Sequence, residues 1–140
     1  MNECPQCGFP LTAAPPRRPA RHRAYFASVY QAWQNLSGDW PSDEHLRKWA
    51  LIKTGWRDER SLICGSDIEA RKVGAFIRPM DTYALVVIDR YIVTVYTARS
   101  QSYRAMDKDT FNRSADDVLA YLSQLLDVPQ PVLEAEGRDA

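Results

Sequence analysis

Two consecutive runs in the second half of the chain predict a β-hairpin, and this hairpin constrains the fold more than any other feature. Residues 83–89 read YALVVID and residues 91–98 read YIVTVYTA, and both runs are rich in β-branched and aromatic side chains. A tight turn at Asp89-Arg90 joins them. Because the first run is almost entirely apolar, we expect it to be a central strand. The alternating second run is expected to keep one face in water.

Helical patterns precede the hairpin. Ser42 is expected to cap a helix that runs to about Thr54 and stops at Gly55. Its solvent side should carry Arg47, Lys48 and Lys53. Before it, residues 21–36 carry an apolar and aromatic stripe at helical spacing, formed by Tyr25, Phe26, Val29, Tyr30, Trp33 and Leu36.

Two more helices complete the pattern. Ser66 and Glu69 form a capping box that opens a helix to about Ile77, and Pro79 ends it. A last helix covers residues 108–126, capped by Asp107 or, if it breaks near residues 112–114, by Ser114. The residues expected to be buried are Ile68, Val73, Phe76 and Ile77 in the first of these helices, and Phe111, Ala115, Val118, Leu119, Leu122 and Leu125 in the second.

The order of these elements defines the expected fold class. With a short strand at 61–64, the order is α-α-β-α-β-β-α, which indicates an α+β fold with a small, mostly antiparallel sheet packed against helices. We divide the 140 residues into a Cys-x-x-Cys arm with a Pro-rich linker (1–20), an α+β domain (21–128) and an acidic tail (129–140). In the tail, a short helical turn around 132–135 is expected before a frayed end.

Charge and cysteine content narrow the class of protein. The formal net charge is zero, with 18 basic and 18 acidic side chains, so no global charge draws the chain to nucleic acid. The charges are nevertheless distributed as a basic head and an acidic tail. An odd number of cysteines and the absence of a signal-peptide pattern or a long apolar run predict a cytoplasmic protein without a disulfide framework.

The N-terminal arm predicts a zinc site. Cys4 and Cys7 have the spacing of a zinc knuckle, but they supply only half of the four ligands that structural zinc requires. Either His22 or a neighbouring chain completes the shell, or the arm is a metal-free remnant; His45 and Cys64 are the other candidate ligands. A thioredoxin-type redox role is disfavoured because no βαβ unit surrounds the pair.

Basic and aromatic residues form a second candidate site. Single-stranded nucleic acid is bound by phosphate contacts from Arg and Lys and by stacking of bases on aromatic rings. Trp40, Trp56 and Tyr103 fall in loops, whereas Tyr25, Phe26, Trp33 and Trp49 are expected in the core. Lys48 and Lys53, on the helix that Ser42 caps, are equally compatible with an ordinary solvent-exposed face. The residues predicted to bind nucleic acid are Arg17, Arg18, Arg21, His22, Arg23, Lys48, Lys53, Trp56, Arg57, Arg60, Tyr103 and Arg104.

Catalytic motifs are scarce in this sequence. It contains no Gly-rich phosphate loop and no Gly-x-Ser-x-Gly elbow, and its two histidines lack acid–base spacing. Asp89 lacks the acidic residue and lysine that a nuclease would place on the following strand. We therefore expect a binding protein rather than an enzyme.

Two stretches resemble phage proteins. Residues 19–36 (PARHRAYFASVYQAWQNL) and 41–60 (PSDEHLRKWALIKTGWRDER) resemble a family of uncharacterised phage and prophage proteins with a Glu-His-Leu-Arg-Lys-Trp motif. Residues 98–114 (ARSQSYRAMDKDTFNRS) are remotely similar to the NinB/Orf-like recombination mediators of lambdoid phages. The second resemblance implies a dimeric accessory protein that binds single-stranded DNA in the host cytoplasm. The residues it carries over are His22, Arg23, Trp49, Ser102, Met106 and Phe111.

Three functions compete at this point. The first is a phage-type recombination or replication accessory that binds single-stranded DNA. It predicts that Arg21, Arg23, Lys48, Lys53 and Arg104 cluster on one face, with affinity that falls as salt rises. The second is an inhibitor or adaptor that acts on a host enzyme without nucleic acid and exposes an apolar patch. The third, a metal-dependent nuclease, predicts convergent carboxylates. Open sheet edges also make a homodimer possible.

Overall fold

The computed structural model describes residues 19–36 and 38–139, which form helices and a three-stranded antiparallel sheet. This confirms the predicted α+β class. The Cys-x-x-Cys arm and most of the linker lie outside the described residues. The elements are α1 (Pro19–Asn35), α2 (Asp43–Lys53), β1 (Arg57–Ile63), α3 (Asp67–Ile77), the 3-10 turn η1 (Arg78–Met80), β2 (Leu85–Asp89), β3 (Ile92–Ala98), α4 (Lys108–Leu126) and α5 (Gln130–Asp139).

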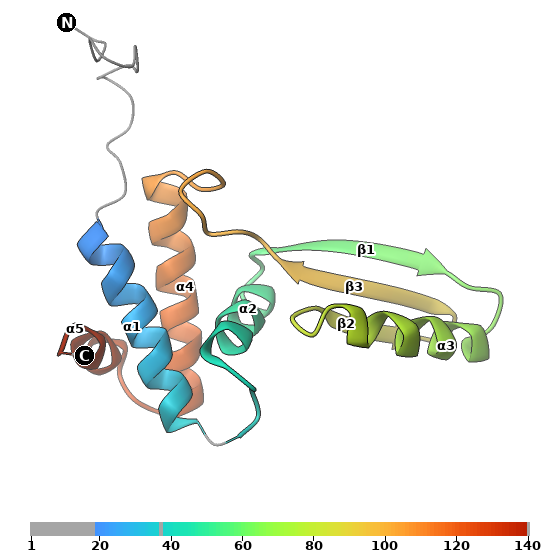
Figure 1. Ribbon diagram of the computed structural model, residues 1–140, viewed down its shortest axis with the longest axis horizontal. Coiled ribbons are helices and arrows are strands. Elements are labelled where there is room, and N and C mark those ends of the chain that lie inside the picture. The colour runs from blue at the N-terminus through green and yellow to red at the C-terminus, as the bar shows by residue number, and fades with distance from the viewer. Residues whose placement is uncertain (1–18, 37, 140) are drawn as a thin grey trace, which may run out of the picture.

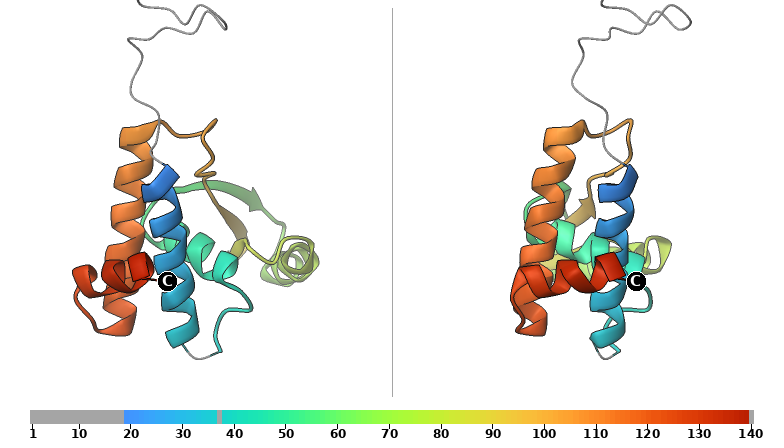
Figure 2. Two further views of the ribbon diagram at one scale, coloured as in Figure 1. Left: turned by 60° about the vertical axis from the view of Figure 1, so that its left-hand side comes forward. Right: turned by 90° about the vertical axis from the view of Figure 1, so that its left-hand side faces the viewer.

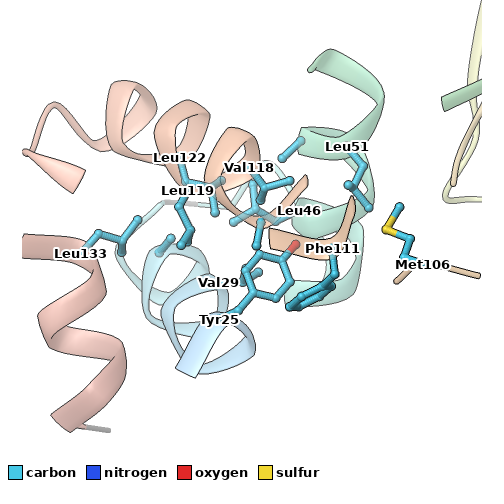
Figure 3. Packing of buried hydrophobic residues seen from close by; sticks show 13 residues of the cluster. Tyr25, Val29, Leu46, Leu51, Met106, Phe111, Val118, Leu119, Leu122 and Leu133 are labelled. Carbon is cyan, nitrogen blue, oxygen red and sulfur yellow. The ribbon is translucent and has the colours of Figure 1, made fainter. Parts of the chain in front are cut away.

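The elements form two parts with different cores. α1, α2, α4 and α5 make a helical part, and the sheet with α3 on one face projects from it (Figure 1). Figure 2 shows α5 crossing the lower half of α1. Side chains of the helical part converge on a large apolar core (Figure 3), formed by Tyr25, Val29, Ala32, Leu46, Ala50, Leu51, Met106, Phe111, Ala115, Val118, Leu119, Leu122 and Leu133. The buried core under α3 is much smaller: Ala70, Val86 and Val93.

The C-terminal helix is longer than predicted. In place of one turn around 132–135, α5 runs over ten residues and inserts Leu133 into the helical core. Gly137 is buried against α1, where an added Cβ would lie 2.0 Å from Ser28 Oγ and 2.7 Å from its backbone nitrogen. A side chain at this position would force the two helices apart. The expectation that the chain frays after this turn is therefore wrong for Gly137.

The hairpin is present, but the prediction of its central strand is wrong. β2 and β3 pair antiparallel around Arg90 and Tyr91, and Arg90 has a φ of 57°. β1 pairs with the other edge of β3, so the strand order is β1-β3-β2 and β3 is central. β2 is apolar although it is an edge strand, because α3 packs over one of its faces. β1 begins at Arg57, whereas the sequence predicted a start at residue 61. The earlier start was not predicted because the charged first half of the strand lies exposed on the sheet edge and shows no apolar alternation.

The buried face of α3 also differs from the prediction. Ile68 and Phe76 are 60% and 70% exposed, whereas Ala70 and Gly74 are buried against the sheet. Val73 and Ile77 pack at the margin of this contact. A Cβ on Gly74 would lie 2.6 Å from Cδ1 of Ile88, so the closest approach requires the small residue. Hydrophobicity alone pointed to the large side chains, but the backbone approaches the sheet along the small ones.

The helix caps follow the sequence closely. Ser42 and Ser66 accept hydrogen bonds from the backbone N–H groups of His45 and Glu69, and Asp107 accepts one from Thr110. α4 continues without a break through Ser114, and of its predicted inward residues Leu125 proves 39% exposed. No helix in the described part of the chain has both the length and the apolar composition to cross a membrane.

Candidate nucleic-acid interface

A buried polar junction joins α1, α2 and α4 beneath the candidate site. Gln101, in the segment between β3 and α4, accepts hydrogen bonds on Oε1 from the Tyr25 hydroxyl and from Nη1 of Arg47, both at 2.8 Å. Its amide nitrogen donates to Ser114 Oγ at 2.8 Å. Arg47 completes the junction by donating from Nε and Nη2 to the two carboxylate oxygens of Glu44, at 2.9 and 2.8 Å. The segment that follows β3 is thereby anchored to three helices.

The burial of Arg47 corrects a sequence expectation. We expected it on the solvent side of α2 with Lys48 and Lys53, but only 8% of it is exposed. Its hydrogen bond to the Glu44 carboxylate lowers the pKa of Glu44, against the opposing effect of partial burial. Burial alone would lower the pKa of Arg47, but its hydrogen bonds and the nearby charges outweigh that effect and raise it. Burial also raises the pKa of Tyr25 above its usual range, so its hydroxyl stays protonated as a donor.

Above this junction lies the first pocket, a hollow of about 470 Å³ between α1, α2 and the segment that follows β3. Its basic side chains are Arg47, Lys48 and Arg99, and Glu44 is its acidic one. Two hydroxyl groups from the segment after β3 add hydrogen-bonding capacity. The full lining is His22, Phe26, Glu44, Arg47, Lys48, Ala98, Arg99, Ser100, Gln101, Ser102 and Tyr103. The first pocket therefore combines positive charge, hydroxyl groups and aromatic rings.

The aromatic side of the first pocket is formed around His22. Its ring stacks on Tyr103, with centroids 5.0 Å apart and planes inclined by 25°, and on Phe111 at 5.4 Å and 24°. Phe26 approaches the same ring at 4.7 Å. Tyr103 is 54% exposed, so it forms the outer end of this stack. An exposed ring held by an aromatic stack below it is a suitable surface for a nucleobase.

The structure brings together only some of the predicted nucleic-acid residues. His22, Lys48 and Tyr103 line the first pocket, whereas Arg21 pairs with Asp116 of α4 at 3.0 Å and lines a different hollow. Arg23 and Arg104 are exposed. Arg17 and Arg18 lie outside the described residues.

Two of the other predicted nucleic-acid residues, Lys53 and Arg57, form cation–π contacts. Lys53 lies over the Trp49 ring at 4.7 Å, and Arg57 lies over Tyr96 at the same distance. Trp56 is half-buried and donates from Nε1 to Asp117 at 2.8 Å, so it is less available for stacking than a loop position suggested. Arg60 is exposed on β1.

Sequence reasoning missed Arg47, Arg99 and Gln101. Arg47 and Glu44 are three residues apart on one helix, and that spacing signals an ion pair. Arg99 and Gln101 lie in a polar loop that gives no periodic signal. Only the fold shows that this loop passes over α1 and α2.

The zinc prediction falls mainly outside the described residues. Cys4 and Cys7 are not described, and His22, the histidine expected to complete their shell, packs between aromatic rings in the first pocket. Within residues 19–36 and 38–139, no group of three or more His, Cys, Asp or Glu side chains is arranged to hold a metal ion. Zinc binding by the arm stays a prediction.

Comparisons with known proteins returned no match: no family model, no curated protein and no solved structure is significantly similar to this chain.

Proposed function

We propose that this protein binds single-stranded nucleic acid through the first pocket, without catalysing a reaction, as an accessory of phage-type DNA recombination or replication. The observation that carries the proposal is the pairing of basic side chains with the exposed Tyr103 ring in one hollow. Phosphate contacts from Lys48 and Arg99 would supply salt-dependent affinity, and stacking on Tyr103 would hold a base. The resemblance to NinB/Orf-like mediators supports the same role.

Oligonucleotide binding tests the proposal directly. Fluorescence anisotropy with a labelled oligo-dT is expected to show binding at low salt that weakens as salt rises. Tyr103→Ala should weaken binding roughly ten- to hundredfold, because one stacked base is lost. Lys48→Ala with Arg99→Ala should lower the slope of log affinity against log salt by about 1.4, since each residue neutralises one phosphate.

Matched controls on the sheet part separate this site from general charge effects. Lys72→Ala on α3 and Tyr91→Ala in the hairpin turn remove exposed side chains of the same types away from the first pocket. Both control variants should bind like the parent protein. Absence of binding at low salt, or equal losses in control and pocket variants, would overturn the proposal.

Exposed apolar side chains favour a second candidate function, an adaptor or inhibitor that binds another protein. Ile63, Phe76 and Met80 are each at least 70% exposed on the sheet part, and all of β1 forms an exposed edge. A second copy of the chain or a host enzyme would cover this surface. If a second copy does so, light scattering should give a dimer mass that Phe76→Glu with Ile63→Glu reduces to the monomer. A monomeric parent protein would exclude the homodimer.

A further inference from the structure

A second pocket lies on the other side of α2 from the first. It has a volume of about 430 Å³ and is formed where the helical part meets the sheet part. The loop before α2, α2 itself and the segment between η1 and β2 each contribute side chains. The lining is Asp39, Trp40, Pro41, His45, Trp49, Thr82, Tyr83 and Ala84. The sequence had singled out Trp40 as a loop ring and Trp49 through the resemblance to recombination mediators, but it did not indicate that they meet in one hollow.

Aromatic rings dominate this second pocket. Tyr83 lies against His45, with centroids 4.3 Å apart, and is 39% exposed. Trp40 and Trp49, whose ring centroids lie 6.3 Å apart, also line it. The partly exposed Tyr83 ring and the half-buried Trp40 and Trp49 rings give this hollow an aromatic lining, which suits a flat, aromatic ligand.

Hydrogen bonds hold the ring of His45 in place. Its Nδ1 lies 2.6 Å from Ser42 Oγ, and its Nε2 lies 3.1 Å from Thr82 Oγ1. The imidazole is therefore fixed as a support behind Tyr83. The charged side chain in the lining is Asp39, and its carboxylate would repel a phosphate. The pocket is thus suited to a base rather than to the sugar-phosphate backbone.

Lys48 connects the two pockets. Successive residues on a helix are rotated by about 100°, so Lys48 lies between the face of Glu44 and Arg47 and the face of His45 and Trp49. It lines the first pocket, and its Nζ lies 4.1 Å from the centroid of the Tyr83 ring in the second. A phosphate bound to Lys48 would have an aromatic pocket on either side.

We propose that the second pocket is a base-binding subsite for the same single strand, which crosses α2 at Lys48. The proposal rests on the function assigned to the first pocket and extends it. One base stacks on Tyr103, the phosphate between the pockets contacts Lys48, and a further base lies against the aromatic lining of the second pocket. Specificity for the strand then comes from two stacking sites separated by one helix.

Substitution of Tyr83 in the full chain tests this subsite. Anisotropy with an oligo-dT of about twelve nucleotides should show a roughly tenfold or greater loss of affinity in Tyr83→Ala. Tyr83→Phe should bind like the parent protein, because the ring is kept. Tyr91→Ala, which removes a tyrosine of similar exposure in the hairpin turn, is the matched control. Thermal unfolding of each variant checks that the fold is retained.

Tryptophan emission provides a second readout, because Trp40 and Trp49 line the subsite. Saturating oligo-dT should quench this emission in the parent protein, and less so in Tyr83→Ala. If the oligonucleotide binds and Tyr103→Ala weakens it while Tyr83→Ala does not, the second subsite is overturned and the first pocket stands. If the parent protein binds no oligonucleotide at low salt, both proposals fail together.

Discussion

Phe111→Ala is expected to lower the free energy of unfolding by about 3–5 kcal/mol, a large share of the stability of a domain this size. Phe111 is 1% exposed and belongs to the helical core, on the side where Met106 lies (Figure 3). Its ring meets Tyr25 edge-on, with centroids 5.5 Å apart, and stacks on His22 at 5.4 Å. Truncation leaves a cavity between α1 and α4 that rigid neighbouring helices cannot close. Chemical denaturation followed by circular dichroism measures the loss.

Phe76→Ala is the matched control for this prediction. The residue type is the same, and the side chain also lies on a helix, but it is 70% exposed on α3. Its truncation should change the free energy of unfolding by less than about 0.5 kcal/mol. Losses of similar size in the two variants would contradict the assignment of Phe111 to the core and Phe76 to the surface.

Arg47→Met is expected to destabilise the protein by about 2–3 kcal/mol, because hydrogen bonds to a charged group are lost where they are shielded from water. Methionine keeps the aliphatic stem of the side chain, while the guanidinium contact with the Phe26 ring, 5.2 Å from its centroid, is lost with the hydrogen bonds. The matched control is Arg71→Met on α3. Arg71 forms an exposed ion pair with Asp67 at 3.8 Å, which should contribute less than about 0.5 kcal/mol.

The contribution of Arg47 should also depend on pH in a defined direction. Arg47 lowers the pKa of Glu44 in the folded protein. The resulting stability is present above the ordinary glutamate pKa of about 4.3 and is lost as the pH falls through the lower folded value. The gap in stability between the parent protein and Arg47→Met should therefore narrow in acid. A gap that is constant down to pH 3 would show that Glu44 is not the partner that matters.

Local signals in the sequence identified most elements but not their packing. The caps at Ser42 and Ser66 and the hairpin were predicted because each depends on residues a few positions apart. The strand order was not predictable in this way, because β1 pairs with β3 across a long stretch of chain that contains α3 and β2. On α3, the apolar pattern identified the helix and misassigned its buried face.

In the candidate site too, single residues were predicted from the sequence but their contacts with one another were not. Tyr103, Lys48 and His22 were predicted from residue type, since aromatic and basic side chains bind bases and phosphates whatever their neighbours. Arg47 and Gln101 were missed because their role depends on one another. Gln101 bonds Tyr25 of α1, Arg47 of α2 and Ser114 of α4, and no local pattern encodes that meeting. The second pocket was missed for the same reason, because its walls come from three separate segments.

The sequence by itself determined the α+β class, the helix starts and the hairpin, because capping, periodicity and β propensity act within a few residues. The tertiary structure decided which strand is central, which face of α3 is buried and which side chains meet in the two pockets. These outcomes depend on how closely whole elements approach. Small residues such as Gly74 and Gly137 set that approach, and their effect becomes visible only when the opposing surface is in place.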